Sequence, residues 1–513
     1  MKIKFLMGDV NLKKISMFLK VVSCVIFLIS FMGADKMKIR EPYVAGKFYE
    51  GNSEKLSSYI NVLFDEAVEP KGQKPRGLIV PHAGYPYSGQ IAADGFSQAK
   101  NYDYDFVVIL GTNHTVYPEE CGFLYDGDGF KTPLGIAYIE TKINEELSKK
   151  GNLFKFNNDA HTREHSIEVE IPFIQKLFPK AKIVPIVIAA SSQESAEKIG
   201  GALSEVLKGR NFLVVASSDL SHYPDFDVAN IVDKETLTAI ATMDNGTIYK
   251  TAKKGELKAN VETSACGIVP IMVLVKAMNE LSCKKVSVIS YANSGQCVIG
   301  EMDRVVGYGS VAFFEGGYEK DVSALDLPKG NENISDKDRD YLLKLARRAI
   351  VDYLNYGVLT LPRFTSDSLI KKQGAFVTLT KKGDLRGCIG HMAEDTPLAT
   401  TVGKMALAAA LQDTRFYPVS KDEMKDIEIE ISVLTPMKEV KGPTDIVIGR
   451  DGTLIQKGGR SAVFLPQVAP EEGWSREEML EHLCMKAGLP TDAYKSNCRF
   501  FTFQAIVFSE KHR

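Results

Sequence analysis

Short apolar runs alternate with helix-length amphipathic segments between residues 76 and 293. Strands of a parallel sheet are nearly continuous in apolar residues because helices cover both faces of such a sheet. The alternation therefore predicts an α/β domain with a mainly parallel sheet. The expected strands lie at 77–80, 106–110, 183–188, 212–215 and 286–290, and two expected helices lie at 192–207 and 233–243.

The composition is that of an ordinary globular protein. The chain has 513 residues, of which 44% are hydrophobic and 25% are charged, with a formal net charge of −2. This excludes a disordered chain, a collagen-like fibre and a multi-span membrane protein, and the length suggests several domains. The near-neutral charge gives no support for a nucleic-acid binder. Eight cysteines without a CxxC pair indicate free thiols in a reducing compartment, so we expect a cytoplasmic protein.

The first 36 residues allow two interpretations. Lys13, Lys14 and Lys20 precede the apolar run at 21–33, which resembles the apolar region of a signal peptide and is short for a membrane span. Alternatively, translation begins at Met37 and the run is not part of the protein. Membrane anchoring or export is expected only if the run is genuine and retained.

A change of character near residue 317 predicts a domain boundary. The stretch 317–334 is polar, contains glycine and proline, and lacks periodicity, as inter-domain linkers do. We therefore expect four parts: the leader-like segment 1–36, a first domain at 37–316, a linker at 317–334 and a smaller second domain at 335–513.

The second domain has the pattern of an α+β fold. Ser335 and Asp338 form a variant of the capping box, which marks the start of a helix. Later runs alternate or are apolar, as strands are, at 375–380, 427–433 and 501–507.

Polar residues with possible chemistry follow the predicted strands of the first domain. His82 follows the strand at 77–80, His114 follows the next, and Asp219 and His222 follow the strand at 212–215. Ligands of open α/β sheets bind beyond the carboxyl ends of the strands, so we expect these residues in one cleft. Imidazole binds iron, zinc and copper and also serves acid–base catalysis. The alternative for each histidine is a structural hydrogen bond beside a glycine-rich turn.

Two further segments carry candidate residues. His165 and Glu168 are one turn apart on a predicted helix, which on its own is also typical of a solvated helix face. Cys266 lies in the small-residue turn 263–267, where a thiol is either presented to a ligand or buried as a small apolar group.

The first domain resembles the Memo family, also called AmmeMemoRadiSam system protein B. That family is similar in fold to the class III extradiol dioxygenases, in which two histidines and a carboxylate hold non-haem Fe(II). The resemblance therefore implies a sheet sandwich with a metal site. Its matching motifs lie, in order, at 44–49, 81–85, 110–114, 164–168, 218–222 and 266–267.

The resemblance implies a role for each matched residue. His82, His114 and Cys266 would hold the metal, and His222 would be the acid–base group with Asp219 fixing its tautomer. A thiolate in place of the dioxygenase carboxylate is a softer donor, and it suits Fe(II), which we expect, as well as zinc or copper. The residues expected to contact substrate or support the ligands are Tyr85, Glu164, His165 and Glu168.

Two functions follow from this resemblance. One is an oxidoreductase of dioxygenase type that acts on an unknown small molecule or peptide. The other is a non-catalytic scaffold or maturation factor that binds a metal or a peptide. Thr115 stands where the family often has a second histidine directly after the first, so a tandem histidine pair has no role here.

The second domain resembles the AMMECR family, AmmeMemoRadiSam system protein A. The chain thus resembles a fusion of two components of one system, whose name implies a radical S-adenosylmethionine protein as a partner. Cys388 follows Arg386 in what the flanking glycines indicate is a turn, and it is either a nucleophile or a packed side chain. The matching motifs lie at 385–390, 413–419, 431–434 and 458–466.

Overall fold

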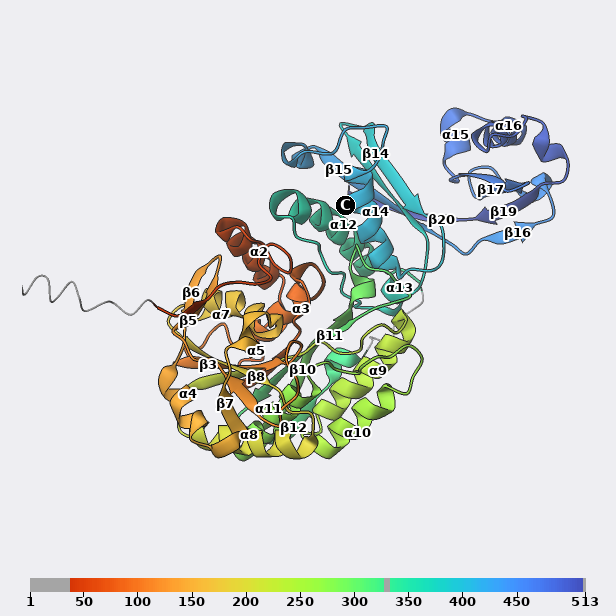
Figure 1. The fold of residues 1–513 in the computed structure, drawn as a ribbon. Helices are drawn as coiled ribbons and strands as arrows, with labels where there is room; N and C mark the ends of the chain where they lie inside the picture. Colours follow the sequence, from red (N-terminus) through yellow and green to blue (C-terminus); the bar gives the residue numbers. More distant parts are fainter. Residues whose placement is uncertain (1–36, 327–332, 511–513) are drawn as a thin grey trace, which may run out of the picture.

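The computed structural model describes residues 37–326 and 333–510 (Figure 1). The two interpretations of the leader-like run concern residues 1–36, which lie outside the described residues. No helix within the described ranges has both the length and the apolar character that crossing a membrane requires.

A nine-stranded sheet forms the centre of the first domain. Its middle strands are parallel: β2 (Pro75–Val80), β9 (Phe212–Ser217), β3 (Phe106–Thr112) and β8 (Lys182–Ile188) lie side by side in that order. The predicted α/β fold is therefore confirmed, although the outer strands make the sheet a mixed one. The outer strands are β11 (Gly307–Phe314), β10 (Cys283–Asn293) and β12 (Gly316–Asp321) on one side, and β4 (Gly122–Leu124) and β7 (Phe154–Phe156) on the other.

Helices cover both faces of this sheet. Along β3, Val108 and Leu110 face one apolar core while Val107 and Ile109 face the other, as the alternation of strand side chains requires. The first core contains α8 (Gln193–Leu207), α10 (Asn245–Gly255), α11 (Ile268–Glu280) and parts of α4 (Thr141–Ser148) and α9 (Phe226–Ile240). The second contains α2 (Ser53–Asp65), α3 (Tyr85–Ser97) and α7 (Ile171–Leu177).

A small second sheet includes the first strand of the described residues. It contains β1 (Ile39–Arg40), β5 (Gly129–Thr132) and β6 (Gly135–Tyr138) in that order. The likeness of the whole to a dioxygenase sandwich stays a prediction.

One expected helix begins earlier than the apolar pattern indicated. The helix predicted at 233–243 starts at Phe226, because Asp225 caps it by accepting a hydrogen bond from the amide of Val228. The helix predicted at 192–207 begins at Gln193 after the cap Ser192, in close agreement with the sequence.

The predicted linker is wrong over its first part. Residues Gly316–Asp321 form β12, a parallel edge strand beside β10, and a short helical turn follows at Ser323–Leu325. Backbone pairing with β10 stabilises a polar stretch whose side chains carry no strand pattern. The first domain therefore extends beyond residue 316.

The second domain has the predicted α+β character. The capping box of Ser335 and Asp338 starts α12 (Asp336–Tyr356), as expected. This helix and α14 (Leu398–Leu411) enclose one apolar core with a four-stranded antiparallel sheet. The sheet has the order β14 (Asp384–His391), β13 (Ala375–Lys381), β15 (Ile427–Leu434) and β20 (Ala505–Ser509), and α13 (Asp367–Ile370) lies next to α14.

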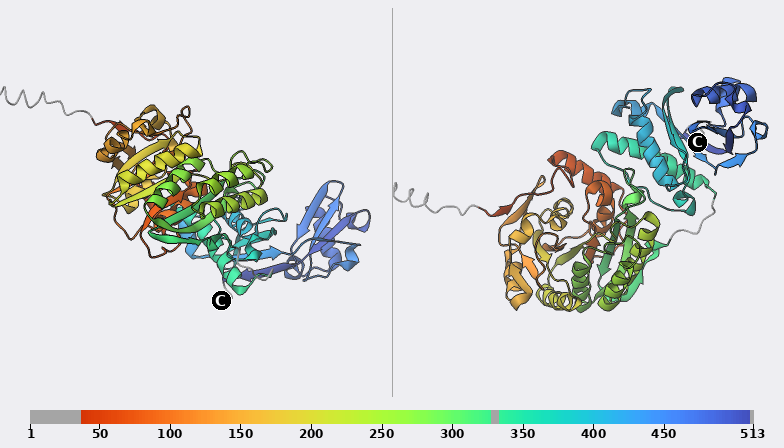
Figure 2. Two further views of the ribbon diagram at one scale, coloured as in Figure 1. Left: turned by 90° about the horizontal axis from the view of Figure 1, so that it is seen from below. Right: turned by 45° about the vertical axis from the view of Figure 1, so that its right-hand side comes forward.

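An outer subdomain stands to one side of this sheet (Figures 1 and 2). The run predicted as one strand at 501–507 is interrupted at Gln504, so that β19 (Arg499–Phe503) belongs to the outer subdomain and β20 does not. The outer sheet has the order β16 (Lys438–Val440), β19, β17 (Gly452–Lys457) and β18 (Arg460–Phe464), with α15 (Val468–Glu472) and α16 (Arg476–Lys486).

The two domains pack directly against each other. The guanidinium of Arg363 binds both carboxylate oxygens of Asp94 on α3, at 2.8 and 3.0 Å. On the neighbouring surface, Thr400 and Lys404 of α14 donate hydrogen bonds to the backbone carbonyls of Gln296 and Gly300. The first domain therefore presents its α3 side to the second domain.

Candidate metal centre

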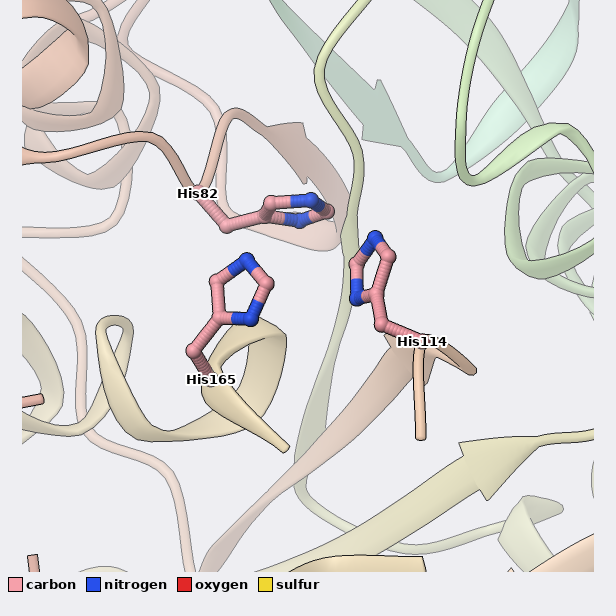
Figure 3. Close-up of side chains that lie close together, drawn as sticks. All are labelled: His82, His114 and His165. Atoms are coloured by element: carbon pink, nitrogen blue, oxygen red, sulfur yellow. The ribbon is translucent and has the colours of Figure 1, made fainter. Parts of the chain in front are cut away.

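Three histidines converge at the carboxyl ends of the central strands (Figure 3). His82 follows β2, His114 follows β3, and His165 begins the one-turn helix α6 (His165–Glu168). Each offers one ring nitrogen, and these nitrogens all lie within 4.8 Å of one another. His82 is buried whereas His114 borders solvent, so the group lies at the base of an open site. This is a geometry in which three imidazoles can share one cation.

The Nδ1 atoms of two of these rings are occupied by hydrogen bonds. Nδ1 of His114 is 2.9 Å from Oε1 of Glu164, whose Oε2 accepts the backbone amide of the same histidine. Nδ1 of His82 is 2.8 Å from Oγ of Ser217, which lies 2.9 Å from Oε1 of Glu170. Hydrogen bonds of this kind fix the tautomer of a metal-binding histidine and leave Nε2 for the metal.

Burial keeps the deepest of these rings neutral. Burial lowers the pKa of His82 well below 6.5, and the neighbouring His114, His165 and His222 lower it further. The pKa of His165 is lowered by burial and by His114. Neutral imidazole is the form that binds a metal, so these rings need not lose a proton first.

Two glutamates beside the histidines have opposite pKa shifts. Burial raises the pKa of Glu164, but hydrogen bonds from His114 and from the amide of Ser166 outweigh it, so its net pKa is lowered. Burial raises the pKa of Glu170 well above 4.5. Glu164 is therefore the ionised partner of the cluster, and Glu170 is a neutral carboxyl group behind Ser217.

Cys266 lies next to the cluster without joining the three-histidine group. Its Sγ is 3.3 Å from Nε2 of His82, and burial raises the pKa of the thiol above its ordinary value. The turn that carries Cys266 approaches Ser218 closely because residue 267 is a glycine, since a Cβ there would come within 2.5 Å of Cβ of Ser218. Of the expected metal ligands, His82 and His114 lie in the cluster and Cys266 lies beside His82, while the third imidazole is His165, which was expected to contact substrate or support the ligands.

Asp219 supports the backbone next to His82 instead of the ring of His222. Its Oδ1 accepts the backbone amides of His82 at 2.8 Å and of Ala83 at 3.2 Å, and burial raises its pKa to about 7. The sequence predicted that Asp219 fixes the tautomer of His222. Within the described ranges no hydrogen bond joins these two side chains, and the carboxyl group holds the loop of His82 instead.

His222 lies at the edge of the same site. Its backbone forms β-bridges with Thr263 and Val306. Its Nε2 is buried and has no hydrogen-bond partner in the part of the chain that the structure describes. Burial lowers the pKa of His222, Glu262 opposes this shift, and His114 adds to it, so the net pKa is below 6.5. A neutral ring with a free nitrogen can accept a proton.

Glu168 and Tyr85 serve the fold in this structure. Glu168 is fully buried and binds Arg40, the hydroxyl of Tyr49 and two backbone amides of the N-terminal segment. The hydroxyl of Tyr85 donates to the carbonyl of Val169, and its ring is buried in the core. Both side chains are buried, so neither has an open surface for substrate contact, which was one of the two roles expected for them.

Ser217 and Glu170 were not found by sequence reasoning. Ser217 is the last residue of β9, and its position at a strand end was the one available signal. Glu170 lies in an acidic segment that has the composition of a solvated helix, yet it is fully buried. Composition cannot distinguish a buried carboxyl group from a solvated one.

Cys388 lies in a strand, and the predicted turn is wrong. Strand β14 pairs with β13, and Sγ of Cys388 accepts a hydrogen bond from Oγ1 of Thr378 at 3.3 Å. Its backbone amide donates to Asp413, which also binds Arg415. Arg386, expected beside the thiol, forms two hydrogen bonds with Glu423. A catalytic role for Cys388 stays a prediction.

Two protein-family models match separate parts of the chain. The first, described as "Memo-like protein", matches residues 40–312, which include all residues of the histidine cluster. The second, described as "AMMECR1", matches residues 343–508.

Curated relatives match the first part at nearly their full length. A MEMO1 family protein of Aquifex aeolicus is 35% identical over 282 residues, covering 54% of this chain and 100% of the relative. One from Methanocaldococcus jannaschii is 35% identical over 291 residues, covering 53% of this chain and 98% of the relative. One from Nitrosopumilus maritimus is 32% identical over 281 residues, covering 54% and 99%.

Solved structures also match parts of the chain. Uncharacterized protein PH0010 from Pyrococcus horikoshii is 40% identical with a TM-score of 0.34, covering 35% of this chain and 94% of that one. Uncharacterized protein JW3007 from Escherichia coli K12 is 11% identical with a TM-score of 0.32, covering 46% and 99%.

Proposed function

Because the chain belongs to the Memo-like protein family and carries an AMMECR1 domain, we propose that its first domain is a metal-dependent oxidoreductase of dioxygenase type. The observation that carries the proposal is the convergence of ring nitrogens from His82, His114 and His165. The metal we propose is iron, with zinc and copper as alternatives.

The side chains around the cluster fit a divalent cation. Glu164 and Ser217 hold two of the imidazoles by Nδ1, which directs Nε2 towards the site. Cys266 can add a sulfur ligand, because its Sγ already lies beside Nε2 of His82. A bound Fe(II) would supply a Lewis acid and a redox centre with positions open to substrate and dioxygen.

His222 is the residue we propose to move a proton. Its free, buried Nε2 and its lowered pKa suit a general base that accepts a proton from a bound hydroxyl group. Asp219 acts indirectly, because it fixes the backbone that carries His82.

The partnership remains a proposal drawn from the family resemblance. We propose that the fused protein acts with a radical S-adenosylmethionine protein, and that the cytoplasm is where the two meet. Co-purification of that partner in the presence of substrate tests this part independently of the metal chemistry.

Metal analysis after anaerobic purification tests the site. We expect about one metal per parent chain and a loss of metal in His82→Ala, His114→Ala and His165→Ala. His391→Ala is the matched control, because that histidine is in the second domain and binds Asp395. Stoichiometric metal in all three site variants would contradict the assignment of these histidines as metal ligands. Loss of metal in Cys266→Ala would add the sulfur to the ligand set.

The thiol of Cys266 also supports a second candidate function. A donor set with a thiolate suits zinc or copper held without turnover, which is the chemistry of a metal-binding scaffold. Oxygen uptake with a panel of catechols after Fe(II) loading separates the two functions. Uptake that requires His222 supports the oxidoreductase, whereas bound metal without uptake supports the scaffold.

A further inference from the structure

A cavity of about 360 Å³ lies where the two domains meet. Its lining combines Ile91 of α3 and Phe226 of α9 in the first domain with Leu361 and Phe364 in the second. Residues of β10 and the turn Ser323–Leu325 complete the lining. None of the residues of the histidine cluster lines it, so the cavity is separate from the metal centre.

The lining has the character of a small-molecule site. Sites of this kind enclose about 300–1,000 Å³, are mostly apolar, contain a few polar groups and are frequent at domain interfaces. Here the apolar side chains come from both domains, and polar ones such as Ser290 and Gln296 belong to the same lining. A cavity left between two packed domains would otherwise cost free energy, because its lining loses packing contacts.

One charged group of the lining has no carboxylate in direct contact. Lys234 of α9 is half-buried, and no carboxylate of the described residues lies within 4.0 Å of its ammonium group. The other charged groups are engaged or exposed: Arg363 binds Asp94, Asp227 binds Lys372, and Asp326 is exposed. Burial lowers the pKa of Lys234, while Asp326 raises it. An anionic ligand group would provide the partner that Lys234 lacks.

We propose that this inter-domain cavity binds an apolar molecule that carries one anionic group. The anion contacts the ammonium group of Lys234, and the apolar body lies between Phe226 and the side chains of Leu361 and Phe364. Such a ligand contacts both domains at once. The site is independent of the metal-dependent activity proposed above.

Displacement of a fluorescent anion from the full chain tests the proposal. The probe is 8-anilinonaphthalene-1-sulfonate, and the competitors are octanoate and 1-octanol, which differ in charge at equal chain length. We expect octanoate to displace the probe more strongly than octanol. In Lys234→Ala the inhibition constant of octanoate, corrected for the weaker binding of the anionic probe, should rise about tenfold, since a charge-assisted hydrogen bond contributes about that factor, while that of octanol is unchanged.

Two controls locate the effect. Lys250→Ala removes an exposed lysine of α10 outside the cavity and should leave both competitors unchanged. His82→Ala should also leave displacement unchanged, because it lies in the other site. Ala324→Trp adds a ring at the lining and should weaken probe binding severalfold.

Three results would overturn the proposal. One is equal displacement by octanoate and octanol in the parent chain. Another is a preference for octanoate that persists in Lys234→Ala. The third is loss of probe binding in His82→Ala, which would place the probe at the metal centre.

Discussion

The carboxyl groups buried in the first domain differ in what surrounds them. Glu164 and Glu168 face histidine and arginine side chains, whereas Asp219 and Asp233 face only neutral donors. Burial raises the pKa of both aspartates to about 7. The first pair therefore holds charged or polar partners in place, and the second pair makes the protein sensitive to pH near neutrality.

Replacing Glu164 by glutamine should weaken metal binding. Glutamine has one acceptor oxygen where the carboxylate has two, so it cannot accept both Nδ1 and the backbone amide of His114, and the ring also loses its charged partner. Loss of such a partner costs about 10–100-fold in metal affinity. Metal titration of the apo-protein measures the change. Glu119→Gln, which breaks an exposed ion pair with Lys155, should leave affinity unchanged. Equal affinities in both variants would contradict the role of Glu164.

Replacing Asp233 by asparagine should change how stability depends on pH. The pKa of Asp233 is 3.8 in the unfolded chain and about 7 when folded, so its contribution to stability is complete below 3.8 and is lost as pH rises to 7. Asparagine cannot ionise, and it can still bind the amide of Ser221 and the hydroxyl of Tyr291. The variant should therefore gain stability relative to the parent between pH 5 and pH 8, by about 1–3 kcal/mol.

Urea unfolding at several pH values measures this gain. A difference between the two proteins that is constant from pH 5 to pH 8 would contradict it.

The shared cleft was predicted from the positions of histidines after strands, whereas the metal ligands were assigned from the family resemblance. His82 and His114 follow strands, so the sheet topology places them together, and the resemblance to the Memo family implied their role as metal ligands. His165 was expected to contact substrate or support the ligands because the family resemblance gave the metal to His82, His114 and Cys266, and its spacing from Glu168 is also typical of a solvated helix face. Ser217 and Glu170 act through contacts between distant segments, which a single sequence does not reveal.

Among the elements, helix α8 packs closely on α11 through a glycine. A Cβ at Gly200 would lie 2.6 Å from the backbone carbonyl oxygen of Val273, whereas at Gly201 the nearest neighbouring atom would be Cε of Lys276 at 3.9 Å. Adjacent glycines in one helix therefore have different functions. The first permits close packing, and the second has space for a side chain.

Alanine at these two positions should have opposite effects. Gly200→Ala forces the helices apart and should destabilise the protein by about 1–3 kcal/mol. Gly201→Ala should stabilise it by about 0.5–1 kcal/mol, because alanine favours the helix over glycine. Chemical denaturation of the two variants under identical conditions gives the comparison. Destabilisation by both substitutions would contradict the packing argument.

Buried strands were predicted well, and irregular or exposed ones were not. The apolar runs of β3 and β8 have the pattern of buried strands, and both are strands of the central sheet. Strand β12 is polar and β14 contains glycines, so their sequences resemble a linker and a turn. Their pairing with β10 and β13 overrides local preference, and pairing depends on residues far away in the chain.

At the scale of the whole molecule, two ion pairs across the domain interface differ in burial. Asp94 is fully buried where it binds Arg363, whereas Lys372 is partly exposed and Asp227 is exposed. Removing one partner of a buried pair leaves an uncompensated charge, but an exposed pair contributes little. The first pair is therefore the one that fixes the second domain to α3.

Arg363→Ala should destabilise the protein by about 2–4 kcal/mol, a value reduced because the arginine is partly exposed. Lys372→Ala is the matched control and should cost less than about 1 kcal/mol. Differential scanning calorimetry measures both changes. We also expect the two domains to unfold in separate transitions in Arg363→Ala. Equal effects of the two variants would contradict the assignment.

The path of the chain through the outer subdomain has one consequence for how such proteins can diversify. Thr435 and Gln504 exchange hydrogen bonds at 2.8 Å, and directly beyond them Leu434 of β15 is paired with Ala505 of β20. Topologically, β15 and β20 thus form a hairpin, and the outer subdomain takes the place of its connecting turn. A unit that enters and leaves at one point can be shortened, exchanged or deleted, and a tight turn can reconnect the arms without disturbing the core beneath.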